Sequence, residues 1–125
     1  MLNSNGETVV ITGASTGIGA ACAWHLDRLG FIVLAGVRRM EDGEALKTQA
    51  SARLQPILLD VTDAASIERA RQLVVGLVGS VGLAGLVNNA GIAVVGPLEA
   101  VPIPDLRRQF EVNVIGQVAV TQAFL

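Results

Sequence analysis

The segment Thr8-Val-Val-Ile-Thr-Gly-Ala-Ser-Thr-Gly-Ile-Gly19 carries the strongest structural signal in the chain. Its first five residues form a β-branched run, which is typical of a buried strand. The glycines that follow permit a tight turn, and residues 18–29 have the spacing of a helix that ends at Gly30. A helix N-terminus after such a turn offers free N–H groups and a partial positive charge to a phosphate. The segment therefore predicts a pyrophosphate cradle, with an ordinary glycine-rich turn as the alternative.

Outward from this segment, strands and helices alternate along the chain. Short apolar runs predict further strands at residues 31–35, 54–59 and 83–87. Helical patterns occupy residues 41–50, 63–78 and 104–125. This β-α-β-α-β-α-β-α order predicts one α/β domain with a doubly wound parallel sheet and helices on both faces. In the first helix we expect the inward face to carry Ile18, Ala21, Cys22 and Leu29.

Composition narrows the possible classes of protein. The chain has 125 residues, is 51% hydrophobic, and has a formal net charge of −2. This length fits one domain or a part of one, and the hydrophobic content excludes intrinsic disorder. The scattered bases and the lack of a basic excess argue against a nucleic-acid partner. Cys22 is the only cysteine, so no intrachain disulfide can form, and we predict no metal site.

No part of the sequence predicts a membrane segment. Residues 73–98 carry no charge, but four glycines interrupt the apolar run within them. A spanning helix needs about 20 continuous apolar residues, so we expect no membrane partner. A secretory leader begins with a basic region and a long apolar run, and residues 1–7 contain neither. We therefore expect a cytoplasmic protein.

The end of the second strand indicates which dinucleotide is preferred. In a dinucleotide site an acidic residue about 20 positions beyond the glycine-rich turn binds the ribose 2′-hydroxyl. Here the segment reads Gly36-Val-Arg-Arg39, and the first carboxylate is Glu41. An arginine can bind the 2′-phosphate that an acid would repel, so Arg38 predicts NADP(H) preferred over NAD(H). The alternative is that both arginines form a solvated strand end.

Polar residues also follow the third and fourth strands. Asp60 can accept a hydrogen bond from an adenine amino group, and the Val61 N–H can donate to the ring; alternatively Asp60 helps to cap the next helix. The segment 88–91 reads Asn-Asn-Ala-Gly, whose small residues allow a ribose to approach the backbone. Asn side chains there can tie neighbouring loops together, although Asn and Gly also favour plain turns.

The last helix is apolar on two sides. One side carries Leu106, Phe110, Val120 and Phe124, with Asn113 and Gln117 among them; the other carries Val112, Ile115, Ala119 and Ala123, with Arg108 at its edge. A helix apolar on both sides is buried on both sides. One side can meet the sheet, so we predict that the other forms a homo-oligomer contact. Asn113 is either a structural tie or part of a site.

Taken together, these motifs resemble the N-terminal part of the short-chain dehydrogenase/reductase family. The glycine-rich segment, Asp60-Val61, the Asn-Asn-Ala-Gly segment and Asn113 occur in the family's order and spacing. The resemblance implies a Rossmann-type fold and hydride transfer between NAD(P)(H) and a small alcohol or ketone. The residues it implies for cofactor binding are Gly13, Ser15, Thr16, Gly17, Ile18, Gly19, Arg38, Asp60, Val61, Asn89, Ala90 and Gly91.

The catalytic residues implied by the resemblance are mostly absent. Asn113 matches the family's active-site Asn, which supports a water bound to the catalytic Lys. The family's catalytic Ser and its Tyr-x-x-x-Lys are expected beyond residue 125; the chain has no tyrosine, and Lys47 is its only lysine. We therefore expect residues 1–125 to be the N-terminal cofactor-binding part of one domain, a reductase fragment inactive by itself. The alternatives are a non-catalytic nucleotide-binding module and a structural oligomerisation piece.

Overall fold

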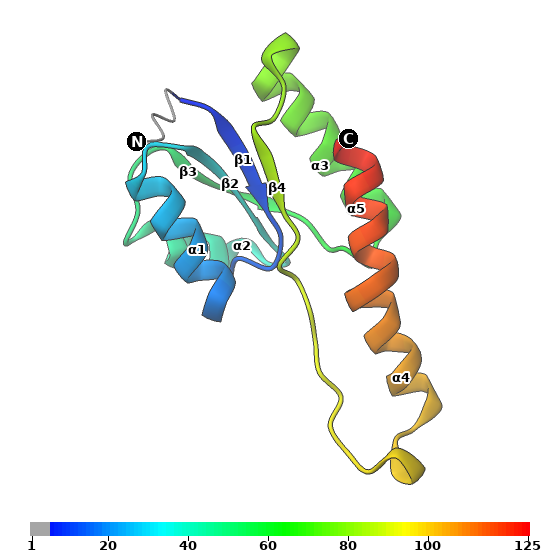
Figure 1. The fold of residues 1–125 in the computed structure, drawn as a ribbon. Helices are drawn as coiled ribbons and strands as arrows, with labels where there is room; N and C mark the ends of the chain where they lie inside the picture. Colours follow the sequence, from blue (N-terminus) through cyan, green and yellow to red (C-terminus); the bar gives the residue numbers. More distant parts are fainter. Residues whose placement is uncertain (1–5) are drawn as a thin grey trace.

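The computed structural model describes residues 6–125, so the expectation about a leader, which depends on residues 1–7, lies mostly outside the described part. Four parallel strands form one sheet in the order β3-β2-β1-β4 (Figure 1). The strands are β1 (Thr8–Ile11), β2 (Ile32–Val37), β3 (Leu54–Leu58) and β4 (Gly85–Val87). The predicted α/β fold with a parallel sheet is confirmed.

Both central strands are apolar on both faces, as strands of a covered parallel sheet are. In the register, Val10 of β1 lies between Leu34 of β2 and Leu86 of β4, and both Val10 and Leu34 are fully buried. Strand β3 lies at one edge and contains Pro56, opposite Ala35. Proline is tolerated at an edge because its missing N–H removes no bond that the sheet needs there.

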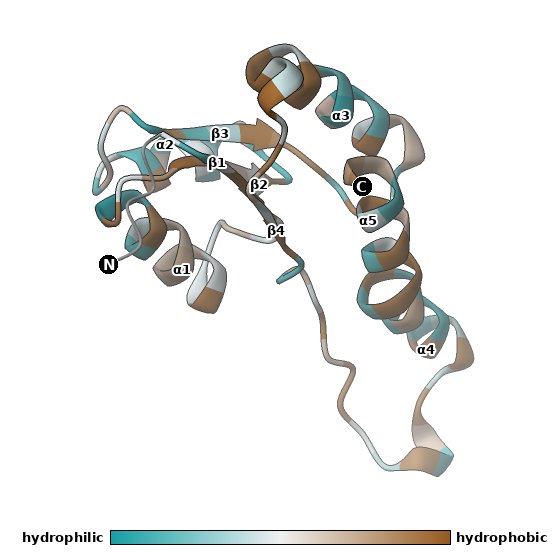
Figure 2. Cartoon of the chain, turned by 45° about the horizontal axis from the view of Figure 1, so that its top comes forward, coloured by the Kyte–Doolittle hydropathy of each residue, from teal (hydrophilic) through white to brown (hydrophobic). Residues whose placement is uncertain are grey.

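Helices cover both faces of the sheet (Figures 1 and 2). On one face lie α1 (Gly17–Arg28) and α2 (Met40–Lys47), and on the other α3 (Ala64–Val78) and α5 (Gln117–Phe124). Each layer has its own buried cluster. The first cluster joins Ala20 and Ala23 of α1 to Val9 and Val33 of the sheet. The second joins α3 and α5 to the opposite sheet face through Ile67, Ala70, Val74 and Val120.

The predicted last helix is one continuous rod with an irregular centre. It comprises α4 (Ile103–Phe110), a π-helical segment (Glu111–Gly116) and α5. A wider turn in its middle changes the phase between the two α-helical parts. A 3₁₀ turn at Gly79–Val81 precedes β4. Between β4 and α4 the chain runs extended away from the sheet and contains a second 3₁₀ turn at Leu98–Ala100 (Figure 1).

This change of phase corrects the predicted faces of the last helix. Val112, Ala119 and Ala123, which we placed on one side of the helix, pack against the buried cluster together with Val120 and Phe124, which we placed on the other. The exposed large apolar side chains of the rod are Ile103, Phe110, Val114, Ile115 and Val118. An unbroken α-helical spacing was the wrong assumption, because the π-helical segment turns one half of the rod relative to the other.

The predicted inward face of α1 is wrong for Ile18, Ala21 and Leu29, whereas Cys22 packs against the buried cluster as predicted. Ile18 is 82% exposed and Leu29 is 48% exposed, whereas Ala20 and Ala23 are buried against the sheet. Small residues face the sheet because the start of α1 lies close to the β1 turn. Asp27 on the same helix is also buried, and its carboxylate accepts hydrogen bonds from the Ser51 N–H at 2.8 Å and the Ser51 hydroxyl at 2.5 Å.

Within residues 6–125, the helices are all too short or too polar to cross a bilayer.

Candidate functional site

The carboxyl ends of the four strands open into one cavity of about 510 Å³. In doubly wound sheets, ligands bind at this edge. The cavity is lined by every residue assigned to cofactor binding from the sequence except Gly17. The further lining residues are Gly36, Val37, Leu59, Thr62, Ile92, Arg108 and Val112.

The glycine-rich turn packs so tightly that side chains do not fit. A Cβ on Gly13 would lie 2.7 Å from the Ala90 Cα. A Cβ on Gly19 would overlap the Gly13 carbonyl and the Asn89 amide. Gly17 begins α1 with a φ of +59° and open space around it, so conformation rather than crowding favours glycine there. The turn therefore brings bare backbone and a helix N-terminus to the cavity wall.

Thr12 joins the ends of β1 and β4. Its buried hydroxyl accepts hydrogen bonds from the N–H groups of Asn89 at 3.0 Å and Ala90 at 2.9 Å. The Asn89 side-chain amide donates to the carbonyls of Thr12 and Gly13, at 3.2 and 3.0 Å. Asn89 is thus a tie between two loops, which decides against a plain turn for residues 88–91.

The two arginines after β2 differ in their surroundings. Arg38 lines the cavity, whereas Arg39 is outside its lining and forms an ion pair with Asp42 at 3.7 Å. Val37, the last residue of β2, is buried. The β2 end therefore presents a cation and no carboxylate to the cavity.

Asp60 points one carboxylate oxygen at its own turn. Oδ1 accepts hydrogen bonds from the Thr62 hydroxyl at 2.6 Å and the Thr62 N–H at 2.9 Å. The Thr62 hydroxyl lowers the pKa of Asp60, and the Thr62 N–H and the charge of Arg38 lower it further against a partial burial that raises it. The N-cap of α3 is Asp63, which accepts from Ala65 and Ser66. Asp60 is therefore not the capping residue of that helix, and it stays ionised in the cavity.

Asn113 ties the π-helical segment to the chain after β4. Its side chain accepts from the Ile92 N–H at 2.8 Å and donates to the Ile92 carbonyl at 2.7 Å. One turn earlier, Gln109 accepts from the Val94 N–H at 2.6 Å. Of the two interpretations of Asn113, the structural tie is observed directly. The Asn113 side-chain oxygen and nitrogen are both hydrogen-bonded to the Ile92 backbone. A catalytic role for Asn113 must therefore be compatible with these two hydrogen bonds.

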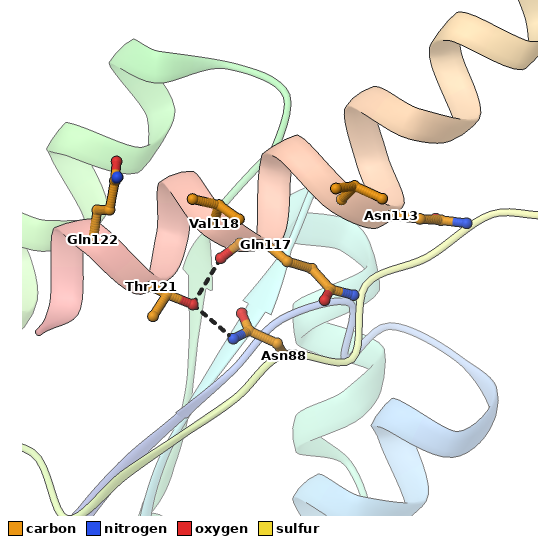
Figure 3. Close-up of a pocket in the computed structure, with 7 residues that line it drawn as sticks. Asn88, Asn113, Gln117, Val118, Thr121 and Gln122 are labelled. Atoms are coloured by element: carbon orange, nitrogen blue, oxygen red, sulfur yellow. Dashed lines mark hydrogen bonds between the residues drawn. The ribbon is translucent and has the colours of Figure 1, made fainter.

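A second, open groove of about 460 Å³ lies on the other side of Asn113, between β4 and the last helix (Figure 3). There the Asn88 amide donates to the Thr121 hydroxyl at 2.9 Å, and that hydroxyl donates to the Gln117 carbonyl at 2.7 Å. Asn113 therefore stands at the boundary between the dinucleotide-sized cavity and this groove.

Sequence reasoning missed three residues that shape the site. Arg108 and Val112 line the cavity from the last helix, and Gly116 packs against Val61, where a Cβ would lie 2.8 Å from the Val61 carbonyl. The sequence carries no local signal for this arrangement, because the π-helical segment 111–116 changes the helical phase between Arg108 and Gly116.

A parallel α/β sheet with a glycine-lined cavity at its carboxyl edge defines a Rossmann-type nucleotide-binding fold. The family model described as short chain dehydrogenase matches residues 7–125. The chain belongs to the short-chain dehydrogenase/reductase family, and family membership implies an NAD(P)(H) cofactor and a small-molecule substrate.

Known relatives are considerably longer than this chain. Mouse retinol dehydrogenase 5 is 42% identical over 118 residues, which are 94% of this chain and 37% of the relative. An NADPH-dependent 3-dehydrocapnine reductase from Ornithobacterium rhinotracheale is 39% identical over 93% of this chain and 41% of its own length. The chain thus corresponds to the N-terminal part of these relatives and spans about two-fifths of their length.

Solved structures agree in fold. A short-chain dehydrogenase from Streptomyces avermitilis superposes with a TM-score of 0.88 at 33% identity, over 99% of this chain and 44% of that one. An NADPH-bound carbonyl reductase from chicken fatty liver also gives a TM-score of 0.88, at 32% identity, over 95% of this chain and 50% of that one.

Proposed function

We propose that this chain is the cofactor-binding part of an oxidoreductase that transfers a hydride between NADP(H) and an alcohol or ketone. The observation that carries the proposal is the cavity at the strand ends, which gathers bare glycine backbone, a helix N-terminus, Arg38 and Asp60. When bound, the nicotinamide supplies or accepts the hydride, while this chain's residues bind and orient the dinucleotide.

The crowded glycine turn supports the pyrophosphate assignment. Gly13 and Gly19 leave no room for a Cβ, so at these two positions the turn presents only backbone to the cavity. We assign Gly13, Ser15, Thr16, Gly17, Ile18 and Gly19 to this subsite. Gly17 contributes through the backbone conformation at the start of α1, because it is outside the cavity lining.

The adenine and ribose subsites follow from the neighbouring strand ends. An ionised Asp60 can accept a hydrogen bond from the adenine amino group through the oxygen that Thr62 does not use. The Val61 N–H can donate to the ring. Asn89, Ala90 and Gly91, held against β1 by Thr12, border the ribose side.

Preference for NADP(H) depends on Arg38. A charge-assisted hydrogen bond to the 2′-phosphate is worth about 1.5–3 kcal/mol, which is about tenfold to a hundredfold in affinity. Two relatives, the 3-dehydrocapnine reductase and the chicken carbonyl reductase, are named for NADPH, which is consistent with this choice.

An apolar alcohol or ketone is the proposed substrate class of the whole protein. The segment 92–103, which leaves the cavity beside Asn113, is rich in exposed apolar residues such as Val95, Leu98 and Ile103. Several relatives are named retinol dehydrogenases, enzymes whose named substrate is an apolar alcohol. We propose that Asn113 acts here as a positioning residue, since its amide holds Ile92 at the start of this segment.

Calorimetric titration of the purified chain with NADPH and NADH tests the cofactor assignment. We expect saturable binding, tighter for NADPH, and a fall of about tenfold or more in the NADPH/NADH preference in Arg38→Asp. Arg39→Asp is the matched control, because Arg39 is outside the cavity lining and should leave the preference nearly unchanged. An unchanged preference in Arg38→Asp would refute the NADP(H) assignment.

A non-catalytic nucleotide-binding module is the second candidate, because the residues that line the cavity account for nucleotide binding alone. Both candidates predict NADPH binding, so a hydride-transfer assay separates them. Ketone-dependent oxidation of NADPH by a protein that includes this chain and a following Ser and Tyr-x-x-x-Lys would establish the oxidoreductase. Binding without turnover in such a protein would favour the module.

A further inference from the structure

Arg108 of α4 reaches the dinucleotide cavity from the helix side. It is one of three charged residues in the cavity wall, with Arg38 and Asp60. Its neighbour Arg107 is also exposed but does not line the cavity. The two adjacent arginines on one helix therefore have different surroundings, and only Arg108 faces the proposed cofactor.

The guanidinium of Arg108 is not engaged by the protein. Among residues 6–125, the Arg108 side chain forms no ion pair and no hydrogen bond. By contrast, Asp60 is held by Thr62, and the charge of Arg38 acts on Asp60. Arg108, like Arg38, thus leaves its side-chain donors and flat face for a ligand.

The position of Arg108 along the helix specifies the part of the ligand that it meets. Arg108 and Val112 both line the cavity, and Gly116 follows them along the rod and contacts Val61, so the three form a row on its cavity side. Gly116 lies against Val61, and Val112 packs on the buried cluster that contains Val61. Arg108 is exposed at the outer end of this row. The row therefore passes over the turn that carries Asp60 and Val61, which is the proposed adenine subsite.

We propose that Arg108 is a cofactor-binding residue whose guanidinium plane covers the face of the adenine ring. A guanidinium is planar and weakly hydrated, and it stacks on aromatic rings while its charge is attracted to their π face. Adenine is such a ring, and the apolar wall of Val61 and Val112 beside Arg108 suits its edge. This role rests on the proposed function, and it differs from that of Arg38 because it does not depend on the 2′-phosphate.

The difference between the two arginines supplies the test. Arg108→Ala in the 125-residue chain should weaken NADPH and NADH by the same factor, about three- to fivefold, measured by calorimetry. Arg38→Ala should weaken NADPH much more than NADH. Arg107→Ala is the matched control and should leave both affinities unchanged. Arg108→Lys keeps the charge but loses the plane, so we expect less than half of the lost binding free energy to be restored.

Each result decides a separate point. Unchanged nucleotide affinity in Arg108→Ala would overturn this role while leaving the proposed function in place. A loss confined to NADPH, or full restoration by Arg108→Lys, would make Arg108 a phosphate ligand and would also overturn stacking. If the unaltered chain binds neither nucleotide, the proposed function itself fails, and this proposal fails with it. Circular dichroism of Arg107→Ala and Arg108→Ala checks that α4 is intact, as expected for alanine at exposed helical positions.

Discussion

The Thr12 hydroxyl accepts the backbone N–H of Asn89 at 3.0 Å, and the Asn89 side-chain amide donates back to the Thr12 carbonyl at 3.2 Å. This reciprocal pair joins residues 77 positions apart in the chain. These hydrogen bonds extend the contact between β1 and β4 beyond the ends of the two strands. They therefore hold together the loop after β1, at the proposed pyrophosphate subsite, and the loop after β4, at the proposed ribose subsite. Their mutual position is therefore fixed before any ligand binds.

Thr12→Val should destabilise the chain by about 2–3 kcal/mol, because it leaves the N–H groups of Asn89 and Ala90 without their acceptor at a buried position. Chemical denaturation monitored by circular dichroism measures the change. Thr12→Ser keeps the hydroxyl and removes only a methyl group, so it should cost about 1 kcal/mol. Equal losses in the two variants would mean that the hydroxyl is not what joins the loops.

The sheet and its strand ends could be predicted from the sequence because their signals are local. A β-branched run followed by glycines predicts β1 and its turn without reference to distant residues, and short apolar runs predict β2, β3 and β4 in the same local way. The strand ends follow as a consequence, since the carboxyl ends of parallel strands share one edge of the sheet. This is why residues as distant as Arg38 and Gly91 could be placed in one cavity.

Long-range packing was the part that the sequence did not reveal. The inward face of α1 was misassigned because apolar residues occur all round that helix, and the choice of Ala20 and Ala23 is imposed by its close approach to the sheet. Buried Asp27 contradicts the usual exposure of acids, and it is tolerated because Ser51, 24 residues away, supplies two donors. The π-helical segment likewise has no local signal, and it changed which residues of the last helix are free.

Gly116 should tolerate no larger residue. A Cβ there would lie 2.8 Å from Val61 atoms and 2.9 Å from the Glu111 carbonyl, so Gly116→Ala must push the last helix away from the turn that carries Asp60 and Val61. We expect a loss of about 1–3 kcal/mol in the free energy of unfolding, as for other overpacked sites, together with weaker binding of both NADPH and NADH.

Gly76 is the matched control for this substitution. It is also helical, in α3, but has no atom within 4 Å of an added Cβ. Gly76→Ala should therefore stabilise the chain by about 0.5–1 kcal/mol through helix propensity alone. If Gly116→Ala behaved like Gly76→Ala in thermal unfolding, the close packing of the last helix on Val61 would be refuted.

The exposed apolar residues of the last helix support the homo-oligomer contact that we proposed from the sequence. The residues that would form it differ from the two faces predicted there. Val114, Ile115 and Val118 are each about half exposed. Val118→Glu should weaken self-association by about tenfold, because a carboxylate buried in an apolar contact has no partner. Light scattering over a range of concentrations measures this. Val75→Glu, at a similarly exposed valine of α3, should have no effect; a complete protein that includes this chain and is monomeric at all concentrations would contradict the proposal.

Thr62 should control the ionisation of Asp60. The Thr62 hydroxyl is the largest influence that holds the pKa of Asp60 below its usual value of 3.8. Because the folded-state pKa is lowered, the stabilising contribution is fully present above the unfolded value and is lost as the pH falls through the folded one. Thr62→Val should therefore raise the pKa of Asp60, which a carboxyl-carbon NMR titration measures directly, and should reduce stability near neutral pH more than in acid. Thr48→Val removes an exposed hydroxyl bonded only to the Ala45 carbonyl and should leave that titration unchanged. An Asp60 pKa that is the same in Thr62→Val and in the unaltered chain would show that the backbone N–H of Thr62 and Arg38 suffice to keep Asp60 ionised.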